Sequence, residues 1–266
     1  MNHNPDTVAA QEHRTWQGAA DAYATSISPF TAYSGQIPLL QEFGRIDGRS
    51  SVLELGSGTG DVAAQLAEIA DHVVGIDFSE NMVDIATNRF PTINFDTADA
   101  ETIPYDDGAF DVVVSCYTAH HFARPERVFG EARRVLKPGG RVSIVMPIQS
   151  EQKSFGAFFE SAREEIPPED VPGGPLLDVD DPTEVGNVLR SAGFASVVSE
   201  KRVKPTRLES IDLLLRAGWA FMGLAAHPQD TQDRIRAKTI ERAANFKKRD
   251  GSYEFPDAVI VAGGVK

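Results

Sequence analysis

The chain has 266 residues and 41% hydrophobic residues, which allow one large α/β domain with a sizeable core and a small cap. Acidic residues outnumber basic ones, 39 against 26, and this net charge of −13 argues against nucleic acid as a partner, because phosphate binding needs clustered cations. The single cysteine, Cys116, excludes an intrachain disulfide, and without a signal-peptide pattern or an apolar run near ~20 residues we expect a cytoplasmic protein with no membrane partner.

The first half of the chain alternates between short apolar segments and helical patterns. A helix is predicted over 7–23 and a shorter one over 37–43. Strands are then predicted at 51–55, 73–76, 93–97, 110–115 and 141–146, with helices at 61–70, from Ser79 onward and at 125–136. Strands that alternate with helices imply right-handed crossovers and a parallel sheet.

The pattern changes after Pro147. Residues 155–165 favour a helix, and the Pro-, Gly- and Asp-rich stretch 166–182 is typical of a loop or lid. A helix at 185–192 and a strand at 195–203 follow, then helices at 208–224 and 229–246 and a last strand at 257–262. The two late helices fall between strands and belong to no layer of the sheet, so we interpret them as a cap over the site.

A glycine-rich turn between the first strand and its helix is the strongest chemical signal. Gly56, Gly58 and Gly60 allow the backbone to turn sharply and to approach a ligand closely. A dinucleotide fingerprint would place its third glycine at position 61, where Asp61 stands and would repel a pyrophosphate. Glu54 adds a second acid, and acidic surroundings suit a ligand with an ammonium and a sulfonium, such as S-adenosylmethionine.

Two further acids follow the second and third strands. Asp77 is placed to hydrogen-bond the two ribose hydroxyls of a bound nucleoside. Dinucleotide enzymes use the same device, so Asp77 alone does not distinguish the two cofactors. The alternative is that Asp77 caps the next helix. Asp99 is placed to accept a hydrogen bond from an adenine amino group, with Phe78 and Met82 covering the ring. The alternative is that Asp99 caps a short helix at 101–103.

Five sequence blocks resemble the class I S-adenosylmethionine-dependent methyltransferases, in particular the small-molecule group related to the ubiquinone and menaquinone methyltransferases. The blocks are Glu54–Gly60, Gly75–Ser79, Asp99–Tyr105, Phe110–Ser115 and Arg134–Gly140, in the order and spacing of that family. The resemblance extends well over residues 16–147. It implies an α/β, Rossmann-like, mostly parallel seven-stranded sheet with an antiparallel last strand, flanked by helices and carrying a small helical cap.

We therefore divide the chain into five parts. Residues 1–46 form an N-terminal helical segment covering the site, 47–147 the cofactor-binding half, 148–206 the rest of the core with the lid loop, 207–250 the cap and 251–266 the final strand.

The resemblance also implies roles for individual residues. The methionine end of the cofactor would be held by Glu54, Gly56 and Gly58, with Ser57 beside them. Asp77 would hold the ribose, Phe78 and Met82 would cover the adenine ring, and Asp99, Ala100 and Glu101 would hold the adenine. Ser115 or Cys116 would lie beside the sulfonium, and Tyr23, Thr31 and Tyr33 would close over the cofactor.

His120 and His121 follow the fourth strand and are the candidate general bases or orienting groups. A neutral imidazole can accept a proton near physiological pH. The alternative is that both histidines only hydrogen-bond the loop backbone. His227 in the predicted cap is a second candidate for the general base. Methyl transfer is an in-line displacement that needs alignment and a dry pocket, and a base only when the acceptor must lose a proton.

Aromatic and apolar side chains predict the acceptor pocket, although plain core packing is the alternative for such a stripe. The candidates are Tyr117, Phe155, Phe159, Trp219 and Met222. Asp106 and Asp107 offer no convincing oxygen cage, so no metal is expected.

The predicted function is methyl transfer from S-adenosylmethionine, with S-adenosylhomocysteine as product, to a small-molecule acceptor by a monomer or homodimer. Alternatives are an NAD(P)-dependent oxidoreductase, a non-catalytic S-adenosylmethionine-binding protein, and a nucleic-acid or protein methyltransferase.

Overall fold

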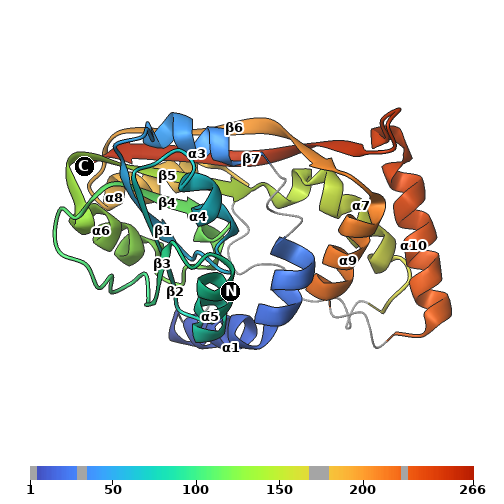
Figure 1. Cartoon of the computed structure of the whole chain (residues 1–266). Coiled ribbons are helices and arrows are strands. Elements are labelled where there is room, and N and C mark those ends of the chain that lie inside the picture. Colours follow the sequence, from blue (N-terminus) through green and yellow to red (C-terminus); the bar gives the residue numbers. More distant parts are fainter. Residues whose placement is uncertain (1–4, 29–34, 168–179, 223–226) are drawn as a thin grey trace.

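A seven-stranded sheet runs through the protein, whose computed structural model describes residues 5–28, 35–167, 180–222 and 227–266. The strand order is β3-β2-β1-β4-β5-β7-β6. All neighbouring strands from β3 to β5 are parallel, whereas β7 runs antiparallel to both β5 and β6. The predicted mostly parallel α/β sheet with an antiparallel last strand is therefore confirmed (Figure 1).

The strands are β1 (Ser51–Leu55), β2 (His72–Asp77), β3 (Asn94–Thr97), β4 (Phe110–Cys116), β5 (Leu136–Pro147), β6 (Ala195–Leu208) and β7 (Tyr253–Val265). The α-helices are α1 (Pro5–Ala22), α3 (Ile37–Gly44), α4 (Asp61–Leu66), α5 (Glu80–Arg89), α6 (Pro125–Val135), α7 (Lys153–Arg163), α8 (Pro182–Ser191), α9 (Ile211–Met222) and α10 (Gln229–Ala243).

Both faces of the central strands are buried, because their side chains are apolar on both sides of the pleat. Leu53 and Leu55 point to one face, where buried residues of α6 and α8 pack, and Val52 points to the other, toward α3, α4 and α5. α6 shows how the sequence specifies such packing, since Pro125 begins the helix and its apolar residues fall on one side. The buried centre of the sheet thus fixes the carboxyl ends of β1, β2 and β4 next to one another.

The two last strands are longer than the sequence pattern indicates. β6 and β7 pair from Ala195 opposite Val265 to Leu208 opposite Tyr253, with one shift of register between Ala195 and Val198, and so extend beyond the core as a two-stranded ribbon (Figure 1). In contrast, α4 ends at Leu66, sooner than predicted, and β5 begins already at Leu136. The ribbon matters for function because it carries the second helical layer.

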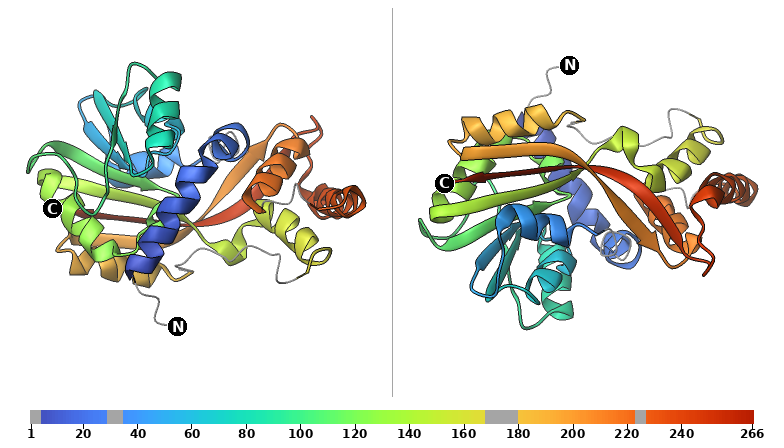
Figure 2. Two further views of the ribbon diagram at one scale, coloured as in Figure 1. Left: turned by 90° about the horizontal axis from the view of Figure 1, so that it is seen from below. Right: turned by 90° about the horizontal axis from the view of Figure 1, so that it is seen from above.

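That second layer consists of α7, α9 and α10, which pack on one another around their own apolar core. Phe158 and Phe255 are fully buried there, which joins the helices to the ribbon. The sheet and this layer lie at opposite ends of the molecule, with the N-terminal segment between them (Figure 2).

The N-terminal segment connects these two layers. α1 packs on α5 of the core, and the π-helical turn Tyr23–Ile27 that follows it packs on α9. No helix in the described ranges has both the length and the apolarity to cross a bilayer.

Candidate active site

The glycine turn after β1 has a left-handed backbone and is locked by the turn after β4. Gly56, Gly58 and Gly60 have φ values of 66°, 52° and 87°, which disfavour other residues. A Cβ on Gly56 would lie 2.1 Å from the Cγ2 atom of Thr118. The Thr118 hydroxyl donates to the carbonyls of Gly56, at 3.1 Å, and Cys116, at 3.0 Å, so two strand ends form one rigid edge.

Asp77 joins the end of β2 to the same turn. Its carboxylate accepts hydrogen bonds from the amides of Gly58 and Ser79, both at 2.9 Å. Burial raises the pKa of Asp77, and these two amide bonds oppose the rise. The Ser79 hydroxyl in turn caps α5 by accepting from the Met82 amide. Asp77 therefore both holds the loop and presents a carboxylate to the crevice beside it.

Glu54 is a buried acid with an unpartnered oxygen. Its side chain is 2% exposed, and Oε2 has no hydrogen-bond partner in the described part of the chain. Burial, together with the nearby charge of Asp61 and Asp77, raises the pKa of Glu54 well above its usual range. The buried hydroxyls of Ser57 and Ser115 are unpartnered in the same way. Such polar atoms are costly unless a ligand completes them.

A narrow crevice opens along this edge and brings together many of the predicted cofactor residues. Its lining residues are Trp16, Tyr23, Gly56, Gly58, Ile76, Asp77, Phe78, Met82, Ala98, Ala100, Tyr117, Thr118, His121 and Phe122. The free volume is only about 90 Å³, because α1 lies over it. His13 of α1 stacks on Phe78, with 5.3 Å between ring centroids.

The other predicted cofactor residues are not among those that line the crevice, and these include the buried Glu54, Ser57, Ser115 and Cys116. Asp99 is exposed, and its carboxylate accepts from the Glu101 amide at 2.8 Å, while Glu101 pairs with Arg124 at 3.2 Å. Neither is among the residues lining the crevice. Thr31 and Tyr33 lie outside the described residues.

Asp61 is neutralised, which changes one argument made from the sequence. Its carboxylate binds Arg89 with two contacts of 2.6 and 2.7 Å and also accepts from the Thr59 hydroxyl. Repulsion of a pyrophosphate by Asp61 is therefore weaker than its position alone implies, and the case against a dinucleotide rests on Glu54 and the glycine spacing.

His120 and His121 meet α1 at the end of the crevice. Their ring centroids are 4.1 Å apart, and burial followed by the charge of His121 holds the pKa of His120 well below its usual range. His121 Nδ1 lies 3.0 Å from Glu12 Oε2, to which Trp16 Nε1 also donates. Burial raises the pKa of Glu12, but His121 and Trp16 outweigh it and lower the pKa overall.

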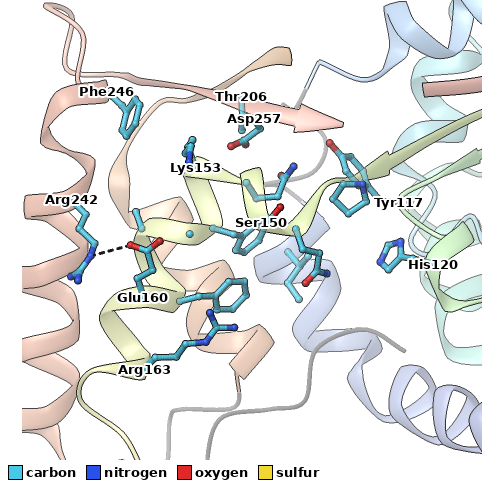
Figure 3. A pocket seen from close by; sticks show the side chains of 18 of the residues that line it. Tyr117, His120, Ser150, Lys153, Glu160, Arg163, Thr206, Arg242, Phe246 and Asp257 are labelled. Carbon is cyan, nitrogen blue, oxygen red and sulfur yellow. Dashed lines mark ion pairs between the residues drawn. The ribbon is translucent and has the colours of Figure 1, made fainter. Parts of the chain in front are cut away.

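A second, larger cavity of about 610 Å³ adjoins the crevice and shares Trp16, Tyr23, Tyr117 and His121 with it. His120, Phe155 and Phe159 also line this cavity, in which α7 forms one wall (Figure 3). Tyr117 has a φ of 52°, a conformation that costs a non-glycine residue energy and that recurs at functional sites. Its strained backbone places the ring between the two cavities.

Lys204 lies buried behind the floor of the larger cavity. Its side chain is 4% exposed, and Nζ donates to the Thr206 hydroxyl at 3.0 Å and lies 5.8 Å from the centre of the Tyr117 ring. Burial lowers the pKa of Lys204 to about 8, despite the opposing charges of Asp257, its cross-strand neighbour, and Cys116. Nothing in the sequence distinguishes this lysine from the exposed charges around it.

Other predicted residues are placed away from the cavities. Met222 and Trp219 belong to the core of the second layer, where Trp219 meets Phe158 edge-to-face at 5.1 Å. The carbonyl of His227 accepts a hydrogen bond from the side-chain amide of Gln232. Within the described ranges no cluster of three His, Cys, Asp or Glu side chains is arranged to bind a metal.

A model of the methyltransferase-domain family matches residues 53–144, the part that contains β1 to most of β5 and the crevice. These residues are thus similar in sequence to that methyltransferase domain. Outside the match lie α1, with Trp16 and Glu12, and the helices α7, α9 and α10.

Two curated proteins and one solved structure illustrate what the chain is similar to. A demethylmenaquinone methyltransferase of Clavibacter sepedonicus is 40% identical over 96 residues, 35% of this chain and 39% of the relative. Phosphoethanolamine N-methyltransferase 1 of Arabidopsis thaliana is 33% identical over 156 residues, 57% of this chain and 30% of that protein. The matches thus span less than half of either relative's length. The YcgJ protein from Bacillus subtilis shares the fold, with a TM-score of 0.54 and 21% identity over 87% of this chain and 97% of that one.

Proposed function

We propose that the protein transfers the methyl group of S-adenosylmethionine to a small-molecule acceptor. The observation that carries this proposal is the buried, unpartnered carboxyl oxygen of Glu54, which lies two residues before the crevice-lining Gly56 in the part of the chain that matches the methyltransferase-domain model. The ammonium group of the cofactor would bind the free oxygen of Glu54, and its ribose hydroxyls would donate hydrogen bonds to Asp77. Glu54 and the glycine spacing, rather than Asp77, disfavour a dinucleotide.

In this proposal the cofactor supplies an activated methyl group, and the chain supplies alignment and exclusion of water. Tyr117 and His121 line both cavities, so the acceptor in the larger cavity would face the cofactor across them. His120 is uncharged near neutral pH because its pKa is lowered, which suits a proton-accepting or orienting group. Ser115 and Cys116 end β4 below this junction.

We further propose that the whole second layer, residues 207–250 with α7, selects the acceptor, while residues 1–46 cover the site. Trp16 and Tyr23 support the covering role, since both line the crevice and the cavity. The single buried cysteine suits a reducing compartment such as the cytoplasm.

Calorimetric titration with S-adenosylhomocysteine tests the proposal, with NADH and NADPH as controls. We expect micromolar binding of S-adenosylhomocysteine alone, and at least tenfold weaker binding by Glu54→Gln, which keeps the shape but removes the charge. Glu68→Gln, an exposed acid at the end of the adjacent turn, is the matched control. Preference for a nicotinamide nucleotide would refute the proposal.

A further inference from the structure

The charge of the larger cavity is opposite in sign to that of the chain. Three basic side chains, Lys153, Arg163 and Arg242, line it against two carboxylates, Glu160 and Asp257. The buried Lys204 lies directly behind Thr206 of the same wall. Acidic residues outnumber basic ones 39 to 26 in the whole sequence, so the excess of basic side chains in this cavity differs from the charge balance of the chain as a whole.

Both carboxylates of the cavity already have partners. Glu160 pairs with Arg242 at 3.5 Å (Figure 3), and Arg242 also binds Glu164, the residue that follows α7, at 2.5 Å. Asp257 accepts hydrogen bonds from the amide and the hydroxyl of Ser154. These acids and Arg242 are therefore engaged with one another or with the scaffold.

Arg163 and Lys153 are the lining cations that remain. In the described part of the chain no carboxylate lies within ion-pair distance of Arg163 or of Lys153. Lys153 is the neighbour of Ser154, which binds Asp257, so the Asp257 carboxylate lies at the same end of α7 as Lys153. Arg163 is ten residues further along, about 15 Å at the helical rise of 1.5 Å per residue. Its side chain extends from α7 toward the cavity interior (Figure 3).

Between Arg163 and the cofactor crevice the wall is aromatic. Phe155 and Phe159 stack, with 5.5 Å between ring centroids and an interplanar angle of 17°. On α7, Phe159 lies about one turn before Arg163 and Phe155 about two turns before it. Tyr117 and His121 lie at the junction with the crevice. A ligand that fills this cavity thus meets aromatic rings near the crevice and a guanidinium at the other end of α7.

We propose that the methyl acceptor is an aromatic molecule that carries an anionic group, a carboxylate or a phosphate, bound by Arg163. The proposal rests on the proposed function and adds the chemical class of the acceptor. A guanidinium presents two parallel donors that match either oxyanion. The aromatic body lies along Phe155 and Phe159, and the atom to be methylated faces Tyr117 and His121. The cavity of about 610 Å³ falls within the size range of small-ligand sites.

Calorimetry with matched probes tests this, in the presence of saturating S-adenosylhomocysteine. The probes are 4-hydroxybenzoate, its neutral isostere 4-hydroxybenzamide, and phenyl phosphate, which distinguishes the two anions. In the wild type we expect the better anion to bind about tenfold tighter than the amide, equivalent to about 1.4 kcal/mol. Arg163→Gln should bring the affinities of all three within about twofold.

Arg236→Gln is the matched control, because Arg236 is an exposed arginine of α10 that pairs with Asp212 and lies outside the cavity lining. It should keep the tenfold preference. Equal binding of anion and amide by the wild type, no binding of either anion, or a preference that survives Arg163→Gln would overturn the inference. Binding of S-adenosylhomocysteine is measured in the same samples, so its failure would count against the proposed function instead.

Discussion

Replacing Lys204 by methionine should change how the stability of the protein depends on pH. The folded protein lowers the lysine pKa from 10.5 to about 8, so the unfolded chain holds this proton more tightly. At 1.36 kcal/mol per pKa unit, the buried charge opposes folding by about 3 kcal/mol at pH 7. This penalty is complete below pH 8 and disappears as the pH rises toward 10.5.

Lys204→Met removes that penalty, which already includes the attraction of Asp257, together with the hydrogen bond to Thr206, which is worth about 1 kcal/mol. We expect the variant to be about 2 kcal/mol more stable than the wild type at pH 7 and less stable by about 1 kcal/mol near pH 10.5, because only the wild type gains stability in between. Urea unfolding followed by circular dichroism at pH 7, 8.5 and 10 measures this crossover.

The control is Lys201→Met, an exposed lysine on the same strand that pairs with Glu151. Its effect should stay within about 0.5 kcal/mol at each pH. A stability difference between Lys204→Met and the wild type that is the same at all three pH values would refute the reasoning.

Three further substitutions probe the crevice. Asp77→Asn places an amide against the Gly58 or Ser79 donor, and we expect at least a tenfold loss of S-adenosylhomocysteine affinity by calorimetry; an unchanged affinity would contradict the ribose-binding role. Gly56→Ala puts a Cβ into Thr118 and should lower the melting temperature clearly more than Gly48→Ala, which meets open space; equal shifts would contradict the tight packing of this turn. Glu12→Gln should speed amide exchange in residues 5–28 at pH 7, measured by mass spectrometry. The difference from the wild type should disappear on acidification, because the pKa of Glu12 is lowered in the folded protein and its carboxylate stops stabilising α1 once it is protonated. Identical exchange at pH 7 would count against the pairing with His121.

The core of the fold could be predicted because local patterns and packing agree there. β1 and β4 are nearly all apolar and buried on both faces, and the glycine turn follows directly. The outer end of the ribbon, beyond Val203 in β6 and before Asp257 in β7, could not, because Pro205 lies opposite Pro256 in the ladder and proline argues locally against a strand. Pairing between distant segments overrides the local pattern in that region.

The site divides along the same line. The loop residues Gly56, Gly58 and Asp77 were predictable, because their spacing carries the geometry of the turn. Trp16 and Thr118 reach the crevice only through contacts between distant segments. For Trp219 the apolar stripe was real, but it packs within its own helical layer rather than toward the cavity.

The closed position of α1 has a kinetic consequence. With about 90 Å³ free, the crevice is below the ~300 Å³ at which small-ligand sites begin, so a nucleoside-sized molecule enters only after Trp16 and Tyr23 swing away. Association should then saturate at high ligand concentration, at the opening rate of the helix. In the proposed reaction each cycle releases one nucleoside product and admits the next cofactor, so that opening rate would set an upper limit on turnover, however fast the methyl transfer itself is.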